Sequence, residues 1–118
     1  MYTDKNRFLI ENILQFCDKI KEAMNRFGDN EDTFKNDHHY HDLCSFYILQ
    51  IGENVKDLSP ELTKKYPDIH WKGIYGTRNK IAHGYHEVDF IRLWNSLTNE
   101  LPALRKACEE ILHELENH

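Results

Sequence analysis

Three side chains that suit work on a phosphate lie close together in the chain: Arg78, His83 and Tyr85. Arginine is a permanent cation whose guanidinium can hold a phosphate with two parallel hydrogen bonds. Histidine is the side chain best placed to move a proton near neutral pH, and tyrosine adds a hydroxyl. The trio therefore suggests a phosphate contact combined with proton transfer, and we take Arg78 and His83 as the candidate catalytic residues.

The spacing of Arg78 and His83 limits how they can meet. On a straight helix, five residues correspond to about 500° of rotation and roughly 7.5 Å of rise, so the two side chains would point about 140° apart. They can converge only if the helix ends between them or if a second copy of the chain supplies one of them. Gly84 predicts a left-handed cap after a helix over 71–82, with His83 and Tyr85 at its unwinding end. The helix dipole would favour the protonated form of His83 there.

Two further residues are candidates for a supporting role. Asn79 could hydrogen-bond the phosphate or orient His83, or it could be an ordinary exposed helix residue. Gly52 lies inside a predicted helix, where glycine costs about 1 kcal/mol relative to alanine, and such a glycine usually allows another helix to come close. Glu53, beside it, is either a surface carboxylate or a residue that lines the site. A structural reading of the motif stays open, in which His83 only caps the last carbonyls.

The rest of the chain predicts the helices that must position this stretch. Apolar residues recur at alternating four- and three-residue steps over 4–27, and a second amphipathic helix is expected over 37–57. Gly28 ends the first of these, and 29–32 is expected to be a polar connection. Ser59-Pro60 starts a short helix, which Tyr66-Pro67 ends near residue 65.

The last apolar pattern runs from Asp89, a predicted helix cap, to the C-terminal end of the sequence. Pro102 lies inside it, but the apolar phase continues unchanged. We therefore expect one long helix kinked near 98–102, with two separate helices as the alternative. With no strand-like alternation and no internal repeat, the 118 residues predict one all-α domain over 1–118, an up-and-down bundle of three long helices plus short ones.

Composition limits the class of function. The net charge of −5 does not fit a protein that coats nucleic acid, so RNA cleavage would need a local basic patch. Its candidate members are Lys72, Arg78 and Lys80, with Lys56 or Arg92 as additions. No apolar segment follows Met1 and none is long enough to span a bilayer, so we expect a cytoplasmic protein with no membrane partner.

No metal site is expected. Cys17, Cys44 and Cys108 lack metal-type spacing and fall on the apolar sides of predicted helices, so reduced core thiols are expected. His38 and His41 are one helical turn apart and could hold a metal, but no third ligand stands at a suitable spacing.

The segment from Arg78 to Tyr85 resembles the signature of the HEPN superfamily. More narrowly it resembles the HepT-like branch, in which arginine is followed by four to six residues, then histidine, any residue and tyrosine. From about residue 40 onward, further segments stand in the order that branch shows. They are Ile51-Gly52-Glu53, Leu58-Ser59-Pro60-Glu61-Leu62, Tyr66-Pro67-Asp68-Ile69, Trp71, Val88-Asp89, Leu93-Trp94 and Leu101-Pro102-Ala103-Leu104.

The resemblance implies an HEPN-like bundle that cleaves RNA without metal or cofactor, at a composite site of a homodimer, to 2′,3′-cyclic phosphate products. It also implies the toxin of a type VII-like toxin-antitoxin pair. The antitoxin of such a pair is a minimal, MntA-like nucleotidyltransferase that adds AMP to the motif tyrosine, here Tyr85. Because cleavage needs a base, an acid and a cation, we infer that two copies of Arg78 and His83 complete one site.

Two other functions stay open. The chain could be a non-catalytic HEPN subunit that binds or recruits substrate for a partner nucleotidyltransferase, which suits the acidic charge better. It could also be a helical dimerisation module whose motif merely caps a helix. The complete set of Arg78, His83 and Tyr85 favours the ribonuclease, because a scaffold does not need all three.

Overall fold

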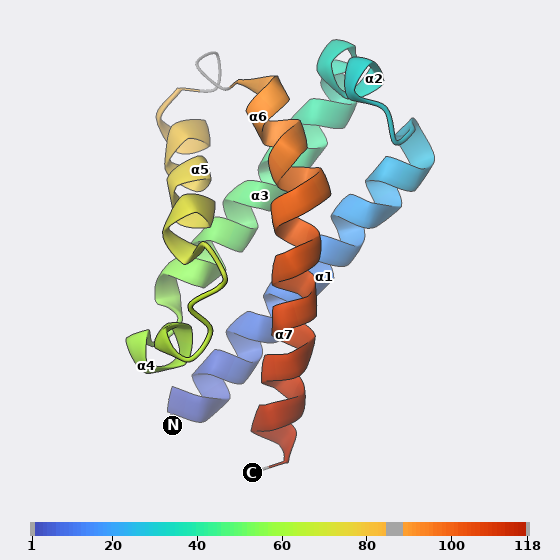
Figure 1. Ribbon diagram of the computed structural model, residues 1–118. Helices are drawn as coiled ribbons and strands as arrows, with labels where there is room; N and C mark the ends of the chain where they lie inside the picture. The colour runs from blue at the N-terminus through green and yellow to red at the C-terminus, as the bar shows by residue number, and fades with distance from the viewer. Residues whose placement is uncertain (1, 85–88, 118) are drawn as a thin grey trace.

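The computed structural model of the chain describes residues 2–84 and 89–117, with the side chains of residues 2, 3 and 83 excluded (Figure 1). Every element within these ranges is helical, which confirms the expected all-α fold. In chain order the elements are α1 (Tyr2–Phe27), α2 (Glu31–Asn36), α3 (His38–Asp57), α4 (Pro60–Lys64), α5 (Trp71–His83), α6 (Phe90–Asn95), the π-helical segment η2 (Ser96–Glu100) and α7 (Leu101–Glu116).

The long helices pack side by side around one core. Helix α3 packs against both α1 and α5, and α7 packs against α1. In Figure 1, α7 stands in front of α1 and α3, and α5 stands to one side of α7. The side chain of Asn6, buried in α1, ties the bundle to the start of α4: its Nδ2 donates to Ser59 Oγ (3.0 Å) and its Oδ1 accepts from Ser59 N (3.2 Å).

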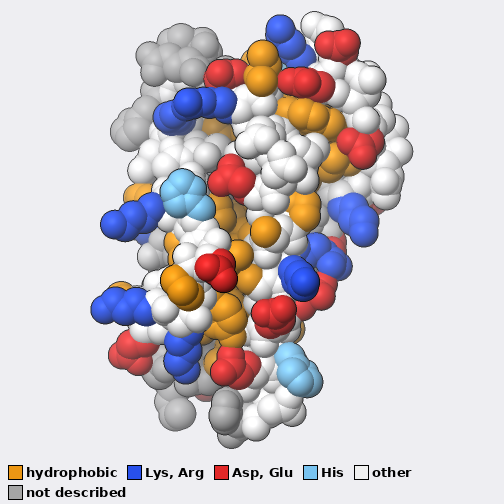
Figure 2. Space-filling view, in the orientation of Figure 1, with side chains coloured by type: hydrophobic (Ala, Val, Ile, Leu, Met, Phe, Trp, Pro, Cys, Tyr) orange, Lys and Arg blue, Asp and Glu red, His pale blue; other side chains and the backbone are white. Residues whose placement is uncertain are grey.

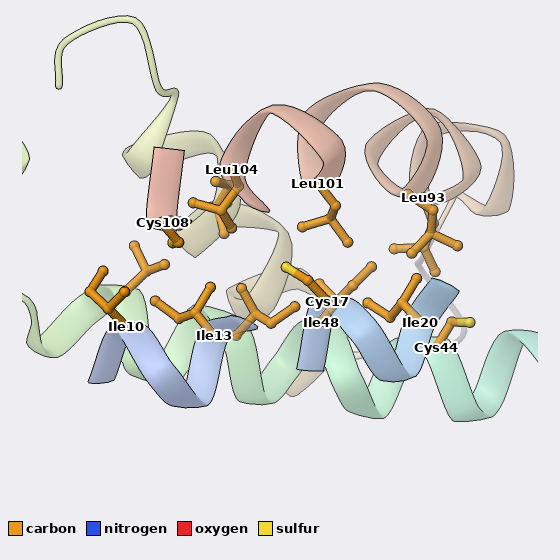
Figure 3. Close-up of a cluster of buried hydrophobic side chains, with 14 of the residues drawn as sticks. Ile10, Ile13, Cys17, Ile20, Cys44, Ile48, Leu93, Leu101, Leu104 and Cys108 are labelled. Atoms are coloured by element: carbon orange, nitrogen blue, oxygen red, sulfur yellow. The ribbon is translucent and has the colours of Figure 1, made fainter. Parts of the chain in front are cut away.

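The core is filled by the apolar stripes that the sequence periodicity predicts. Figure 3 shows side chains of α1 and α3 meeting those of α6 and α7, and the three cysteines lie among them. Burial raises the pKa of Cys17 and of Cys44 to about 12, so both thiols stay protonated at neutral pH. The expectation of core thiols is confirmed, and their burial makes them poor nucleophiles.

The connection between α1 and α3 differs from the expected polar loop over 29–32. Gly28 ends α1 with a φ of 115°, and α2 then begins at Glu31, where Asn30 Oδ1 accepts from Thr33 N (3.0 Å). Phe34 is completely buried, with its ring edge-on to Tyr40 at a centroid distance of 5.0 Å. A helix of one and a half turns carries too little apolar periodicity to stand out in the sequence, and burial of Phe34 decides its formation.

Helix α6, the segment η2 and helix α7 follow one another without a gap and form what we call the C-terminal rod. This confirms the continuous helix expected through Pro102. Its irregularity lies at η2, where Leu101 N donates to the Ser96 carbonyl, five residues back. Proline cannot donate a backbone hydrogen bond and crowds the carbonyl four residues before it. The π turn comes directly before Pro102, so the strain is absorbed without a break in the rod.

Three predicted helix starts are confirmed by their caps. The carboxylate of Asp37 accepts from His39 N, the hydroxyl of Ser59 accepts from Leu62 N, and the carboxylate of Asp89 accepts from Ile91 N. None of the helices in the described ranges is long and apolar enough to cross a membrane.

Candidate functional site

Helix α5 carries the motif, and its start is fixed from two sides. Trp71 Nε1 donates to the Tyr66 carbonyl (3.0 Å), which folds the segment after Pro67 back onto the helix. The hydroxyl of Tyr66 in turn hydrogen-bonds Glu114 of α7. Burial, and then this hydrogen bond, raise the pKa of Tyr66 to about 12, so it remains a donor at neutral pH. Helix α5 is thereby tied to the C-terminal rod.

The end of α5 lies one residue later than predicted, at His83. Gly84 follows with φ −172° and ψ 97°, and its N–H donates to the Lys80 carbonyl (3.2 Å). This is extended backbone, so the expected left-handed cap is wrong. Any residue type can adopt these backbone angles, so the conformational freedom of glycine is not what ends α5.

Gly52 of α3 lies directly against Arg78 of α5. A Cβ atom built on Gly52 would stand 2.3 Å from Arg78 Cβ and 2.8 Å from Arg78 Cγ. The expectation that this glycine lets another helix come close is confirmed. The contact between these two residues fixes where the stem of Arg78 leaves its helix.

The guanidinium of Arg78 is held by its neighbours in what we call the α3–α5 contact: Gly52, Glu53, Arg78 and Asn79. Arg78 Nη2 pairs with the carboxylate of Glu53, and Arg78 Nη1 donates to Asn79 Oδ1 (2.7 Å). The Arg78 side chain is 23% exposed and that of Glu53 is 38% exposed. Among the described residues Arg78 Nε, which is buried, has no hydrogen-bond partner.

The structure thus brings together Arg78, Asn79 and Glu53 of the predicted site. It places residue 83 at the last position of α5, five residues beyond Arg78. That register sets the two Cα positions about 140° apart around the helix axis, because the helix does not end between them. The side chain of His83 and all of Tyr85 lie outside the described residues, so their predicted roles stay predictions.

The expected basic patch is divided between two faces of α5. Arg78 is turned towards α3, whereas Lys80, two residues on, lines a groove on the other side together with Arg92 of α6. Lys72 and Lys56 are exposed, and no ion pair is found for either in the part of the chain that is described.

That groove was not predicted. It has a volume of about 820 Å³ and separates α5 from α6 and η2; we call it the α5–α6 groove. The residues that α5 contributes to the groove recur every three or four positions, and this spacing is the signal in the sequence that could have revealed the groove. This wall consists of Gly73, Gly76, Thr77, Lys80 and Ile81.

The histidines at the start of α3 make other contacts. The rings of His38 and His39 are tilted to each other by 38°, with centroids 4.1 Å apart. His41 Nδ1 lies 3.2 Å from Asp42 Oδ1, and the centroid of its ring lies 4.1 Å from that of Phe90. Within residues 2–84 and 89–117, no group of three or more His, Cys, Asp or Glu side chains is arranged to hold a metal ion.

Comparison with known proteins adds independent information. A family model described as "Ribonuclease HepT-like" matches residues 13–111. "Putative RNase TTE0752" of Caldanaerobacter subterraneus subsp. tengcongensis is 33% identical over 103 residues, covering 87% of this chain and 90% of that protein.

Two archaeal relatives match over a shorter stretch. "Putative RNase MJ0125" of Methanocaldococcus jannaschii is 38% identical over 66 residues, 56% of this chain and 57% of the relative. "Probable ribonuclease HepT" of Thermococcus cleftensis is 30% identical over 61 residues, 52% of this chain and 56% of the relative. The matched stretch therefore spans little more than half the length of these two relatives. No solved structure matches the chain.

Proposed function

Because the chain belongs to the ribonuclease HepT-like family, we propose that it is an endoribonuclease that uses Arg78 and His83 on the RNA backbone. The observation that carries the proposal is the α3–α5 contact. An arginine whose stem is fixed by Gly52 and whose guanidinium is held by Glu53 and Asn79 is oriented before any substrate arrives. Its remaining Nη hydrogens can still donate to a phosphate.

The proposed reaction is a transesterification within the RNA. The 2′-oxygen loses its proton to a base and attacks the adjacent phosphorus, the bond from phosphorus to the 5′-oxygen breaks, and an acid protonates that 5′-oxygen. The products carry a 2′,3′-cyclic phosphate and a 5′-hydroxyl. Arg78 stabilises the negative charge that builds up on the phosphate oxygens, and such a contact is typically worth about 10²–10³ in rate. Neither metal nor cofactor is required in this scheme.

We propose that two chains form the site, since one copy of the motif supplies only Arg78 and His83, and the Cα positions of these two residues lie about 140° apart around α5. An exposed aromatic side chain lies two turns before Glu53 on α3. Phe46 of α3 is 54% exposed and precedes Glu53 by seven residues, which places the two on the same side of the helix. An exposed aromatic side chain is a typical anchor of a protein interface.

The dimer is tested by light scattering of Phe46→Asp against Ile91→Asp. Ile91 is equally exposed, at 56%, but lies on α6. We expect wild type and Ile91→Asp to form dimers, and Phe46→Asp to be a folded monomer without cleavage activity. A wild-type monomer that cleaves RNA would refute the composite site.

The catalytic proposal is tested by RNA cleavage with purified wild type, Arg78→Ala and His83→Ala. Both variants are expected to lose at least about a hundredfold in rate while helical circular dichroism stays unchanged. Wild-type cleavage is expected to persist in EDTA. Loss of activity in chelator with recovery in Mg²⁺ or Mn²⁺ would contradict a metal-independent mechanism.

The proposed biological role is the toxin of a type VII-like toxin-antitoxin pair. A minimal nucleotidyltransferase would switch it off by attaching AMP to Tyr85, which adds a negative phosphate two residues beyond His83. Co-expression with such a partner, followed by peptide mapping, should find AMP on Tyr85 and none on the Tyr85→Phe variant. An inhibited complex without added mass would show that contact alone neutralises the toxin.

One observation supports the second candidate, a non-catalytic HEPN subunit. The carboxylate of Glu53 already pairs with Arg78, which lowers the positive charge offered to a phosphate, and the chain as a whole is acidic. The two candidates separate on one result: a His83→Ala protein that is indistinguishable from wild type in RNA cleavage and in toxicity would favour the subunit.

A further inference from the structure

The α5–α6 groove lies on a different side of α5 from Arg78 and plays no part in the scheme above. At about 820 Å³ it falls within the range of roughly 300–1,000 Å³ that is usual for ligand sites. One wall is α5 and the other is α6 with η2, and Figure 2 views the molecule with these elements towards the reader. Basic and acidic side chains are interleaved on this face, so which of them have internal partners decides what the groove attracts.

The two cations of the groove are available to a ligand. Lys80 and Arg92 come from opposite walls and are exposed, and no ion pair is found for either within the described ranges. The acids have internal partners instead. Asp89 Oδ1 accepts from Ile91 N and Arg92 N, as the cap of α6, and Glu100 Oε1 accepts from Ser96 Oγ (2.7 Å). Both carboxylates keep their negative charge, but these hydrogen bonds hold them in place, whereas Lys80 and Arg92 are left open to contact an anion.

An aromatic surface stands at the opposite end of the groove from Asp89. The side chain of His70 is 75% exposed, and its Nδ1 lies 3.9 Å from Glu100 Oε2. Its ring lies against the α5 backbone, because a Cβ atom on Gly73 would stand 2.4 Å from His70 Nδ1. A ring that rests on a helix with its other face open is a platform on which a nucleic acid base can stack.

We propose that the α5–α6 groove binds a single-stranded RNA segment next to the cleavage site. Lys80 and Arg92 contact its phosphates and His70 stacks on one of its bases. The groove runs along the helix that carries the motif, and Lys80 lies one turn before His83, so a strand held there can continue to the end of α5. The inference rests on the proposed function, in that it names how the same RNA is held beside the catalytic residues.

The charge contacts are tested with a short fluorescein-labelled 2′-O-methyl RNA, which binds but cannot be cleaved because its 2′-oxygen carries no proton. Lys80→Ala and Arg92→Ala are each expected to weaken binding about fivefold and to lower the slope of log affinity against log salt by about 0.7. Lys35→Ala on α2 and Lys106→Ala on α7 are the controls, since both residues are exposed and outside the groove. Equal losses for all four variants would overturn the proposal.

The stacking contact is tested by a matched pair of glycine substitutions in α5. Gly73→Ala pushes the His70 ring away from the helix, whereas a Cβ atom on Gly76 meets nothing within 4 Å. Gly73→Ala and His70→Ala are expected to weaken binding about fivefold, and Gly76→Ala, which adds a methyl group to the same wall without touching His70, is expected to weaken it much less. Alanine favours a helix over glycine, so neither substitution should harm the fold. Wild-type affinity in both His70→Ala and Gly73→Ala would overturn the stacking role.

Cleavage assays separate the failure of this inference from that of the proposed function. If both hold, the groove variants raise KM and leave kcat close to that of wild type. Cleavage by wild type with KM unchanged in Lys80→Ala and Arg92→Ala would overturn the groove and leave the ribonuclease standing. Groove-dependent RNA binding without any cleavage would keep the groove and refute the ribonuclease. RNA binding independent of the groove, with a partner nucleotidyltransferase covering these residues, would assign the groove to protein and overturn the proposal.

Discussion

Helix α5 meets its neighbours in two contrasting ways, and a glycine marks each of them. At the α3–α5 contact, Gly52 has no room for even one methyl group because the Cβ of Arg78 occupies that position. At the α5–α6 groove, Gly76 faces open space and a Cβ atom there would meet nothing within 4 Å. The same residue type is thus a requirement of packing in one place and an opening in the other.

The cations follow the same division. Arg78 is fixed in place by Glu53 and Asn79, whereas Lys80 has no ion-pair partner in the described part of the chain. A group that must stabilise a transition state gains from being held beforehand, because little reorganisation is then needed during the reaction. A group that captures a passing phosphate gains from being exposed. Two cations that lie two residues apart on one helix can therefore suit different steps, Arg78 the stabilisation of a transition state and Lys80 the capture of a phosphate.

The largest effect on activity is expected for Arg78→Lys. A lysine keeps the charge but cannot hold Glu53, Asn79 and a phosphate with a rigid planar fork. We expect cleavage to fall at least about a hundredfold in single-turnover assays, with unchanged circular dichroism. Near-normal activity would show that charge alone is needed at this position and would remove the distinction between Arg78 and Lys80.

A large effect on both stability and activity is expected for Gly52→Ala. The new methyl group must push α3 and α5 apart, since it meets Arg78 at its Cβ rather than at a flexible tip. Overpacking of this kind costs about 1–3 kcal/mol, from which the better helix propensity of alanine subtracts about 1 kcal/mol. Urea denaturation should therefore show a net loss of up to about 2 kcal/mol in the free energy of unfolding, together with reduced cleavage.

The control for Gly52→Ala is a double-mutant cycle with Arg78→Gly, which removes the clashing Cβ. The double variant should lose less stability than the sum of the two single losses, because the alanine side chain then has space. Additive losses would mean that the cost of Gly52→Ala has another origin than contact with Arg78.

A moderate effect is expected for Glu53, as a residue that positions Arg78. Glu53→Ala should lower kcat about tenfold with little change in KM, and Glu53→Gln should recover most of the loss because its amide oxygen can still accept from Arg78 Nη2. Steady-state kinetics of the two variants decide the matter. Faster cleavage by Glu53→Ala would show instead that the carboxylate competes with the RNA phosphate for Arg78.

The smallest effect is expected for Gly76→Ala. Alanine in place of a helical glycine without steric conflict should raise the free energy of unfolding by about 0.5–1 kcal/mol and leave kcat unchanged. Thermal denaturation and cleavage kinetics on the same preparation measure both. A loss of stability would mean that the groove side of α5 is packed against something, and the contrast with Gly52 would disappear.

Much of the fold is local in origin, and so the sequence by itself determined it. The limits of α5 came within one residue, and Asp37, Ser59 and Asp89 cap the helices they were expected to begin, because a cap depends on residues only two or three positions away. The apolar periodicity determined which faces are buried, including the three cysteines. The ordered motif around Arg78 was sufficient to indicate the HepT-like family.

Only the tertiary structure decided how distant residues combine. The pairing of Glu53 with Arg78 follows from the packing of α3 on α5, which no local pattern specifies. The formation of α2 depends on burial of Phe34 against other helices, and the direction of the chain at Gly84 is not set by glycine. Their spacing of two residues already turns Arg78 and Lys80 to different sides of α5, but only the packing decides that α3 covers the side of Arg78 and the groove opens on that of Lys80. Periodicity reports that a face is buried, but the neighbour that buries it is chosen by packing across the whole chain.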